Sequence, residues 1–117
     1  MPMSQPIFKI VARPEWQAAR LAGVYRGAPV DLSDGFIHFS TAEQVEETAA
    51  RHFGGQRDLL LVAVDPQALG PALKYEPSRG GALFPHLYAV LPFSAVLWEK
   101  PIPETSAGGH DFSGLVA

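Results

Sequence analysis

Leu59-Leu60-Leu61-Val62-Ala63-Val64 is the stretch that decides the fold of this chain. It contains no polar residue and does not alternate, so both faces of the strand that it forms must be covered. We therefore expect a central strand buried from two sides. The side chains predicted to form the core with it are Phe39, Val45, Phe53, Leu61, Val62, Leu73 and Val96.

Upstream of this strand, the pattern predicts one strand and two helices. Ile7 to Ala12 reads as a first strand. Pro14 suits the first turn of a helix that Gly23 ends, and the breakers between residues 24 and 33 predict irregular structure. Thr41 and Gln44 have capping-box spacing, which predicts a second helix ending near Gly54.

Downstream, two more strands are predicted. Residues 72–76 alternate, with Leu73 and Tyr75 expected inward and Lys74 and Glu76 outward. Residues 94–100 form the last expected strand, and the prolines and glycines that follow predict an extended tail over residues 101–117.

These elements indicate the α+β class. We expect a twisted, mostly antiparallel, split sheet, with two main helices from the N-terminal half packed on one side. The chain reads as a single domain over residues 1–117, with its core at about residues 7–100.

Composition narrows the possible functions. The net charge is −3 without a basic block, so the electrostatic footprint of a nucleic-acid binder is missing. The absence of Cys excludes disulfides, thiolate metal sites and a Cys nucleophile. No apolar run is long enough for a membrane span, and the first residues do not resemble a secretory signal. By elimination we expect a cytoplasmic protein.

The most informative motif for function is Asp34-Gly35-Phe36-Ile37-His38-Phe39-Ser40-Thr41. It reads as a strand that runs into a helix. Alternation places His38 and Ser40 on one face, about 7 Å apart, opposite the apolar Ile37 and Phe39. His38 is also the residue type that changes charge near neutral pH, so this face is a candidate site.

A second segment, Phe84-Pro85-His86-Leu87-Tyr88, repeats the pattern, with His86 and Tyr88 on one face. We predict that both strands line one cleft. Its lining would be His38, Ser40, Glu76, His86 and Tyr88, with Arg79 on a mobile glycine-rich loop at the mouth. The competing interpretation is that these are isolated polar residues, each hydrogen-bonded near a strand end.

Other chemistries are less favoured by the spacing. No two of His38, His52, His86 and His110 have a spacing typical of metal ligands, so no metal site is predicted. Ser40 lacks the Gly-x-Ser-x-Gly elbow of a hydrolase. The loop around Gly80 lacks the lysine spacing of a Walker-type phosphate site.

The two motifs, residues 35–41 and 84–88, resemble the signature motifs of a bacterial family named only as domain of unknown function 952. The resemblance extends from about residue 7 to residue 98. It implies a fold similar to that of the ADP-ribosyltransferases, whose split antiparallel sheets hold NAD in a cleft.

By that resemblance, His38 holds the ribose of NAD, Tyr88 stacks on the ligand and Glu76 supplies negative charge where an oxocarbenium ion develops. The catalytic candidates are then His38, Glu76 and His86, and the ligand-holding candidates are His38, Ser40, Arg79 and Tyr88. Two functions remain open: NAD-using ADP-ribosyl transfer or NAD glycohydrolysis, and a non-catalytic module that binds a nucleotide-like or small anionic ligand.

Overall fold

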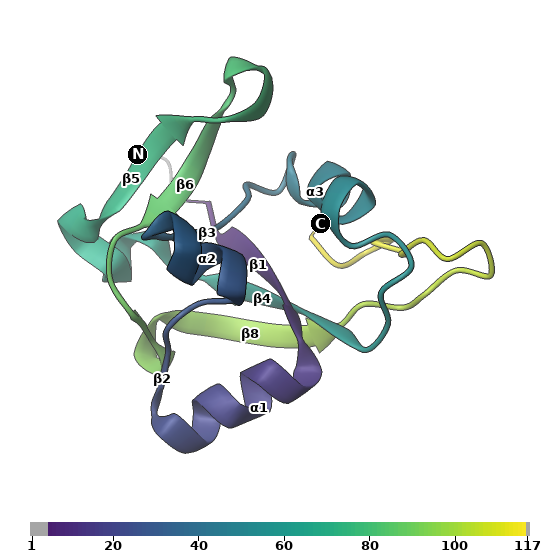
Figure 1. Ribbon diagram of the computed structural model, residues 1–117, viewed down its shortest axis with the longest axis horizontal. Helices are drawn as coiled ribbons and strands as arrows, with labels where there is room; N and C mark the ends of the chain where they lie inside the picture. The colour runs from purple at the N-terminus through teal and green to yellow at the C-terminus, as the bar shows by residue number, and fades with distance from the viewer. Residues whose placement is uncertain (1–4, 117) are drawn as a thin grey trace.

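The computed structural model describes residues 5–116, and they form an α+β fold with three antiparallel sheets (Figure 1). The central sheet contains β1 (Ile7–Ala12), β4 (Leu59–Val64) and β8 (Val96–Pro101), in the order β1-β4-β8. The all-apolar strand is therefore the middle strand, as predicted. Every residue of β4 is buried.

Two hydrophobic clusters cover the two faces of this sheet. One lies under helix α1 (Arg13–Ala22), which contributes Trp16 and Ala19. The other lies under helix α3 (Val45–His52), which contributes Val45 and Ala49. The expectation that the helices pack on one side is wrong, because β4 presents apolar side chains in both directions and each face needs its own cover.

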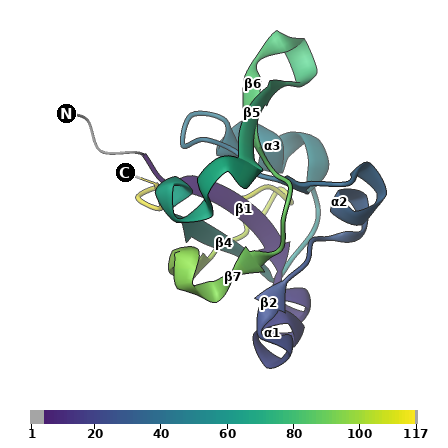
Figure 2. The ribbon, with the colours of Figure 1, turned by 90° about the vertical axis from the view of Figure 1, so that its left-hand side faces the viewer.

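A second sheet brings the two motifs together. It contains β3 (Ile37–His38), β5 (Leu73–Pro77) and β6 (Leu83–Leu87), in the order β3-β6-β5. A bridge between Phe8 and Ser40 joins this sheet to β1. The β5–β6 hairpin projects from the body of the molecule (Figures 1 and 2).

Short elements complete the fold. β2 (Val24–Tyr25) pairs with β7 (Leu91–Pro92). Three 3₁₀ segments cover Pro66–Ala72, Arg79–Gly81 and Phe93–Ala95. The last of these occupies the start of the strand predicted for residues 94–100, so β8 begins two residues later.

Residues 24–33 are not irregular, contrary to the prediction. Besides β2, they include most of helix α2 (Pro29–Asp34). Pro29 stands at the first helical position, and the Asp31 carboxylate accepts the N–H of Ala28 at 2.8 Å. These local signals start a helix of one and a half turns, and Gly35, with φ of 89°, ends it.

Two other local predictions need correction. Gln44 Oε1 accepts the N–H of Thr41 at 3.0 Å, but this contact closes a turn, and α3 begins only at Val45. Tyr75 is 47% exposed instead of inward, because it lies on the projecting hairpin, beyond the core that holds Leu73.

Residues after β8 contribute to the core. Ile102 and Phe112, in the segment predicted as an extended tail, are buried in the cluster under α3. A bridge between Glu104 and His110 folds this segment back on itself. Within residues 5–116, no helix has the length and apolar character that a membrane crossing requires.

Candidate functional site

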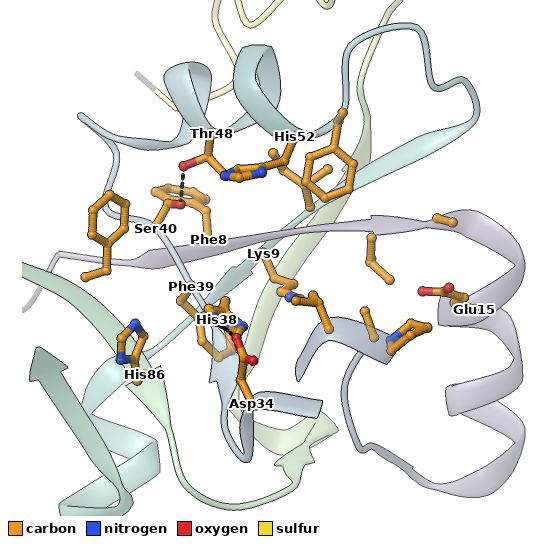
Figure 3. Close-up of a pocket in the computed structure, with 18 of the residues that line it drawn as sticks. Phe8, Lys9, Glu15, Asp34, His38, Phe39, Ser40, Thr48, His52 and His86 are labelled. Carbon is orange, nitrogen blue, oxygen red and sulfur yellow. Dashed lines mark hydrogen bonds and ion pairs between the residues drawn. The ribbon is translucent and has the colours of Figure 1, made fainter. Parts of the chain in front are cut away.

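A cavity of about 660 Å³ opens between the central sheet, at β1, and the sheet that contains β3 and β6 (Figure 3). Three predicted site residues, His38, Ser40 and His86, line it. Glu76 and Tyr88 do not belong to the lining. The other polar side chains of the lining are Lys9, Glu15, Asp34, Thr48, His52, Gln56 and Ser78.

The two histidines come from adjacent paired strands. His38 on β3 is the register partner of His86 on β6, so their side chains share one face of the sheet. Their ring centroids are 5.5 Å apart in an edge-on arrangement. Phe36 packs against both rings, and its ring centroid lies 4.6 Å from that of His38 and 4.1 Å from that of His86. The alternation of the two motifs therefore leads to one shared face, which is what a common cleft requires.

His38 is held by a buried carboxylate. Asp31 Oδ1 lies 2.6 Å from His38 Nδ1 and also accepts the backbone N–H of His38 at 3.1 Å. The other oxygen, Oδ2, lies 2.8 Å from Lys9 Nζ. Asp31 is 1% exposed and Lys9 is 6% exposed, so this is a buried charged cluster beneath the cavity.

The opposite charges of Asp31 and Lys9 each favour the ionised form of the other. Burial alone would raise the pKa of Asp31, but the hydrogen bond from His38 and the charge of Lys9 outweigh it and lower that pKa to about 2. Burial also lowers the pKa of Lys9, although the attraction of Asp31 opposes the shift. Asp31 is thus a permanent carboxylate at neutral pH, and its role is to fix the ring of His38.

A second carboxylate reaches the other nitrogen of His38. Asp34 Oδ2 lies 3.1 Å from His38 Nε2, and the Asp34 side chain is 47% exposed. His38 therefore has an acidic partner at each ring nitrogen, one buried and one open to solvent. A doubly protonated ring satisfies both contacts.

His86 has its own carboxylate. Glu76 Oε1 lies 2.7 Å from His86 Nδ1 and accepts the Tyr88 hydroxyl at 2.8 Å. These two hydrogen bonds lower the pKa of Glu76, and the bond to Glu76 raises the pKa of Tyr88. Glu76 was predicted to line the cleft with His86 and Tyr88; it contacts both of these residues but does not belong to the cavity lining.

The remaining predicted residues are more dispersed. Ser40 is buried, and its hydroxyl lies 3.0 Å from that of Thr48 on α3. The side chain of Arg79 lies outside the described part of the structure, and the prediction that it stands at the cleft mouth stays a prediction. His110, far along the chain, lies with Nε2 2.8 Å from the carbonyl oxygen of Gln56.

Sequence reasoning missed three residues of this site: Lys9, Asp31 and Asp34. Lys9 carried a signal, since it is the only polar residue in an otherwise apolar strand. Asp31 lies in the segment predicted to be irregular, so no face could be assigned to it, and Asp34, the first residue of the first histidine motif, was not singled out as a site residue. Among residues 5–116, no group of three or more His, Cys, Asp or Glu side chains is arranged to hold a metal ion.

Comparison with known proteins places the chain in a family. The sequence profile described as "Protein of unknown function (DUF952)" matches residues 10–99. The chain belongs to the DUF952 family. Both histidine motifs and the central strand fall within the matched residues.

Solved structures of a related protein share this fold. The crystal structure of protein CC0527 from Caulobacter crescentus is 46% identical, with a TM-score of 0.92, and the match covers 96% of this chain and 98% of that one. The solution NMR structure of CC0527 is 47% identical, with a TM-score of 0.85, and covers 96% and 97%. Among proteins with curated descriptions, none matches this DUF952 chain.

Proposed function

We propose that the cavity binds a nucleotide-like ligand and that the domain cleaves a bond at the ribose C1′ carbon, with NAD as the first candidate substrate. The proposed reactions are ADP-ribosyl transfer and NAD glycohydrolysis. The observation that carries the proposal is the pair of carboxylates, Asp34 and Glu76, that touch the two histidines of the cavity wall.

The charge pattern suits this chemistry. Breaking a nicotinamide–ribose bond develops positive charge on the ribose, and fixed negative charge nearby stabilises that transition state. Hydrogen bonds from His86 and Tyr88 lower the pKa of Glu76, so it stays ionised at neutral pH. Both bonds end on Oε1, and Oε2 accepts no hydrogen bond from the described residues.

The cavity suits a nucleotide in size and lining. Its volume of about 660 Å³ lies within the range typical of small-molecule sites. Phe8, Phe39, Phe53 and Phe84 line it beside a few polar groups, which is the mixture that binds an aromatic base and a ribose. The split antiparallel sheets also agree with the ADP-ribosyltransferase-like fold that the motifs suggest.

A non-catalytic binding module is the second candidate. It is favoured by the position of Glu76, which lies behind His86 and is absent from the cavity lining. If Glu76 only orients His86, the domain binds its ligand without turning it over.

Two measurements on the full chain test these functions. A thermal-shift panel of NAD, ADP-ribose, AMP and ATP tests binding, since a ligand at 100 times its Kd stabilises the fold by about 2.7 kcal/mol. Release of nicotinamide from NAD tests cleavage. His38→Ala is expected to weaken binding, and Glu76→Gln is expected to abolish turnover with little change in binding.

The control is Glu47→Gln, the same kind of change at an exposed carboxylate that does not line the cavity, and it should leave both readouts unchanged. Binding without nicotinamide release identifies the non-catalytic module. If the wild type shows no thermal shift with NAD and releases no nicotinamide, NAD is rejected as the ligand.

A further inference from the structure

The two histidines of the cavity wall differ in their hydrogen bonds. His86 Nδ1 faces Glu76, whereas Nε2 has no hydrogen-bond partner among the side chains that the structure describes. A ring that donates from Nδ1 keeps a lone pair on Nε2, which can accept a proton. His38 faces a carboxylate at each nitrogen, Asp31 and Asp34, so both of its nitrogens are placed to donate a hydrogen bond.

From this asymmetry we infer that His38 and His86 are a general acid–base pair, with His38 as the acid and His86 as the base, and that the substrate is a nucleoside or nucleotide whose N-linked base carries no charge. The inference rests on the ribosyl-bond cleavage proposed above and names its substrate class. With ring centroids 5.5 Å apart, both imidazoles reach one bound ribose and its leaving group.

The leaving group decides the substrate class. In NAD the departing nicotinamide nitrogen is already cationic, and it becomes neutral when it takes the bonding electrons. A purine or pyrimidine base departs as an anion unless it receives a proton. An acid beside the ribose therefore has a use for neutral nucleosides and none for a pyridinium.

The contacts of His38 allow it to reach a leaving group. Its contact with Asp34 measures 3.1 Å and is the longer one, compared with 2.6 Å to Asp31. Asp34 is half exposed and ends α2 next to Gly35. A leaving-group nitrogen can displace Asp34 from Nε2, while the buried Asp31 keeps the ring in place.

The reaction is a hydrolysis. The C1′–N bond breaks and its electron pair stays on the base nitrogen, which takes the Nε2 proton of His38. A water oxygen bonds to C1′ and passes one proton to His86 Nε2. The products are the free base and the ribose or ribose phosphate, and solvent returns the proton from His86 to His38.

The test compares two kinds of leaving group on the full chain. Wild-type protein is incubated with inosine, with inosine 5′-monophosphate and with NAD, and release of hypoxanthine and nicotinamide is measured. Hypoxanthine release is expected from at least one inosine substrate. His38→Asn should lower it by on the order of 10²–10⁴-fold, while any nicotinamide release changes by less than about tenfold.

His86→Gln should slow the release of both leaving groups, since water attacks C1′ in every case. Glu47→Gln, a control at an exposed carboxylate outside the cavity lining, should leave both rates unchanged. Circular dichroism of each variant checks folding. Nitrogen-15 NMR of the wild type at pH 7 is independent of any variant, and it should show His38 protonated at both ring nitrogens and His86 at Nδ1 alone.

The outcomes separate this inference from the proposed function. Hypoxanthine release without nicotinamide release supports the acid–base pair and removes NAD as a substrate. Nicotinamide release without hypoxanthine release overturns the acid–base pair and supports NAD as the substrate. Equal loss of both products in His38→Asn, or a proton on His86 Nε2 in the NMR spectrum, overturns the assigned roles. Release of neither product by the wild type rejects both proposals.

Discussion

Asp31→Asn changes the shape of the side chain very little, yet we expect it to lower the free energy of unfolding strongly. The Asp31 carboxylate is buried and contacts Lys9 Nζ, the ring and backbone N–H of His38, and the N–H of Ala28. Asparagine keeps the shape but removes the charge. Lys9, itself buried, is then left without its carboxylate partner.

The size of the effect follows from these contacts. Breaking a buried ion pair by removing one partner costs about 3–5 kcal/mol, because the other charge stays uncompensated. The pKa of Asp31 provides a second figure: it falls from 3.8 to about 2, and at about 1.4 kcal/mol per pKa unit this shift corresponds to about 2 kcal/mol. The stabilisation that comes from the lowered pKa of Asp31 depends on pH. Because the pKa is lower in the folded state, this stabilisation is present above pH 3.8 and is lost as the pH falls toward 2.

Urea unfolding of the wild type and of Asp31→Asn, measured from pH 7 to pH 2, checks this prediction. The variant should be about 3–5 kcal/mol less stable than the wild type at pH 7, and this difference should shrink by about 2 kcal/mol as the pH falls from 4 to 2. Lys9→Met in the Asp31→Asn background should recover most of the loss, since an apolar residue replaces the unpaired charge. A gap under about 0.5 kcal/mol at pH 7, or one that does not change with pH, would refute the reasoning.

Three further predictions concern stability and use urea unfolding at pH 7. Leu61→Ala should cost about 2–5 kcal/mol, because Leu61 is fully buried in the central strand and its truncation leaves a cavity; a loss within measurement error would contradict this. Tyr25→Phe should stabilise the protein by up to about 1–3 kcal/mol, since the buried Tyr25 hydroxyl has no hydrogen-bond partner in the described structure, and a clear loss would reveal a hidden partner. Gly35→Ala should cost about 1–2 kcal/mol, because its φ of 89° is strained for alanine although nothing lies within 4 Å of the added Cβ; an unchanged midpoint would show that the turn relaxes.

Much of the fold was predictable where one local pattern dominated. The apolar run of β4 predicted a central strand, and the structure confirms it. The core prediction also holds: Phe39, Val45, Leu61 and Val62 are buried. The other three predicted members, Phe53, Leu73 and Val96, are partly buried and pack against the same clusters.

The errors arose where short-range signals competed. Helix α2 has only six residues, too few for a periodic pattern, so its breakers suggested irregular structure. Tyr75 alternates correctly with its neighbours, but alternation does not say where the core ends. Nothing local shows that the β5–β6 hairpin leaves the body of the protein at that point.

The sequence by itself determined the family, the α+β class and the face of its own strand that each histidine occupies, because alternation along a strand is a local property of the backbone. That the two strands pair and bring His38 beside His86 is a result of the tertiary structure. Only the tertiary structure decided which carboxylate serves which histidine. Asp31 reaches His38 because α2 folds against β3, and Glu76 reaches His86 because β5 pairs with β6. Such contacts join elements whose relative placement comes from burying both faces of β4, and no spacing in the sequence records that placement.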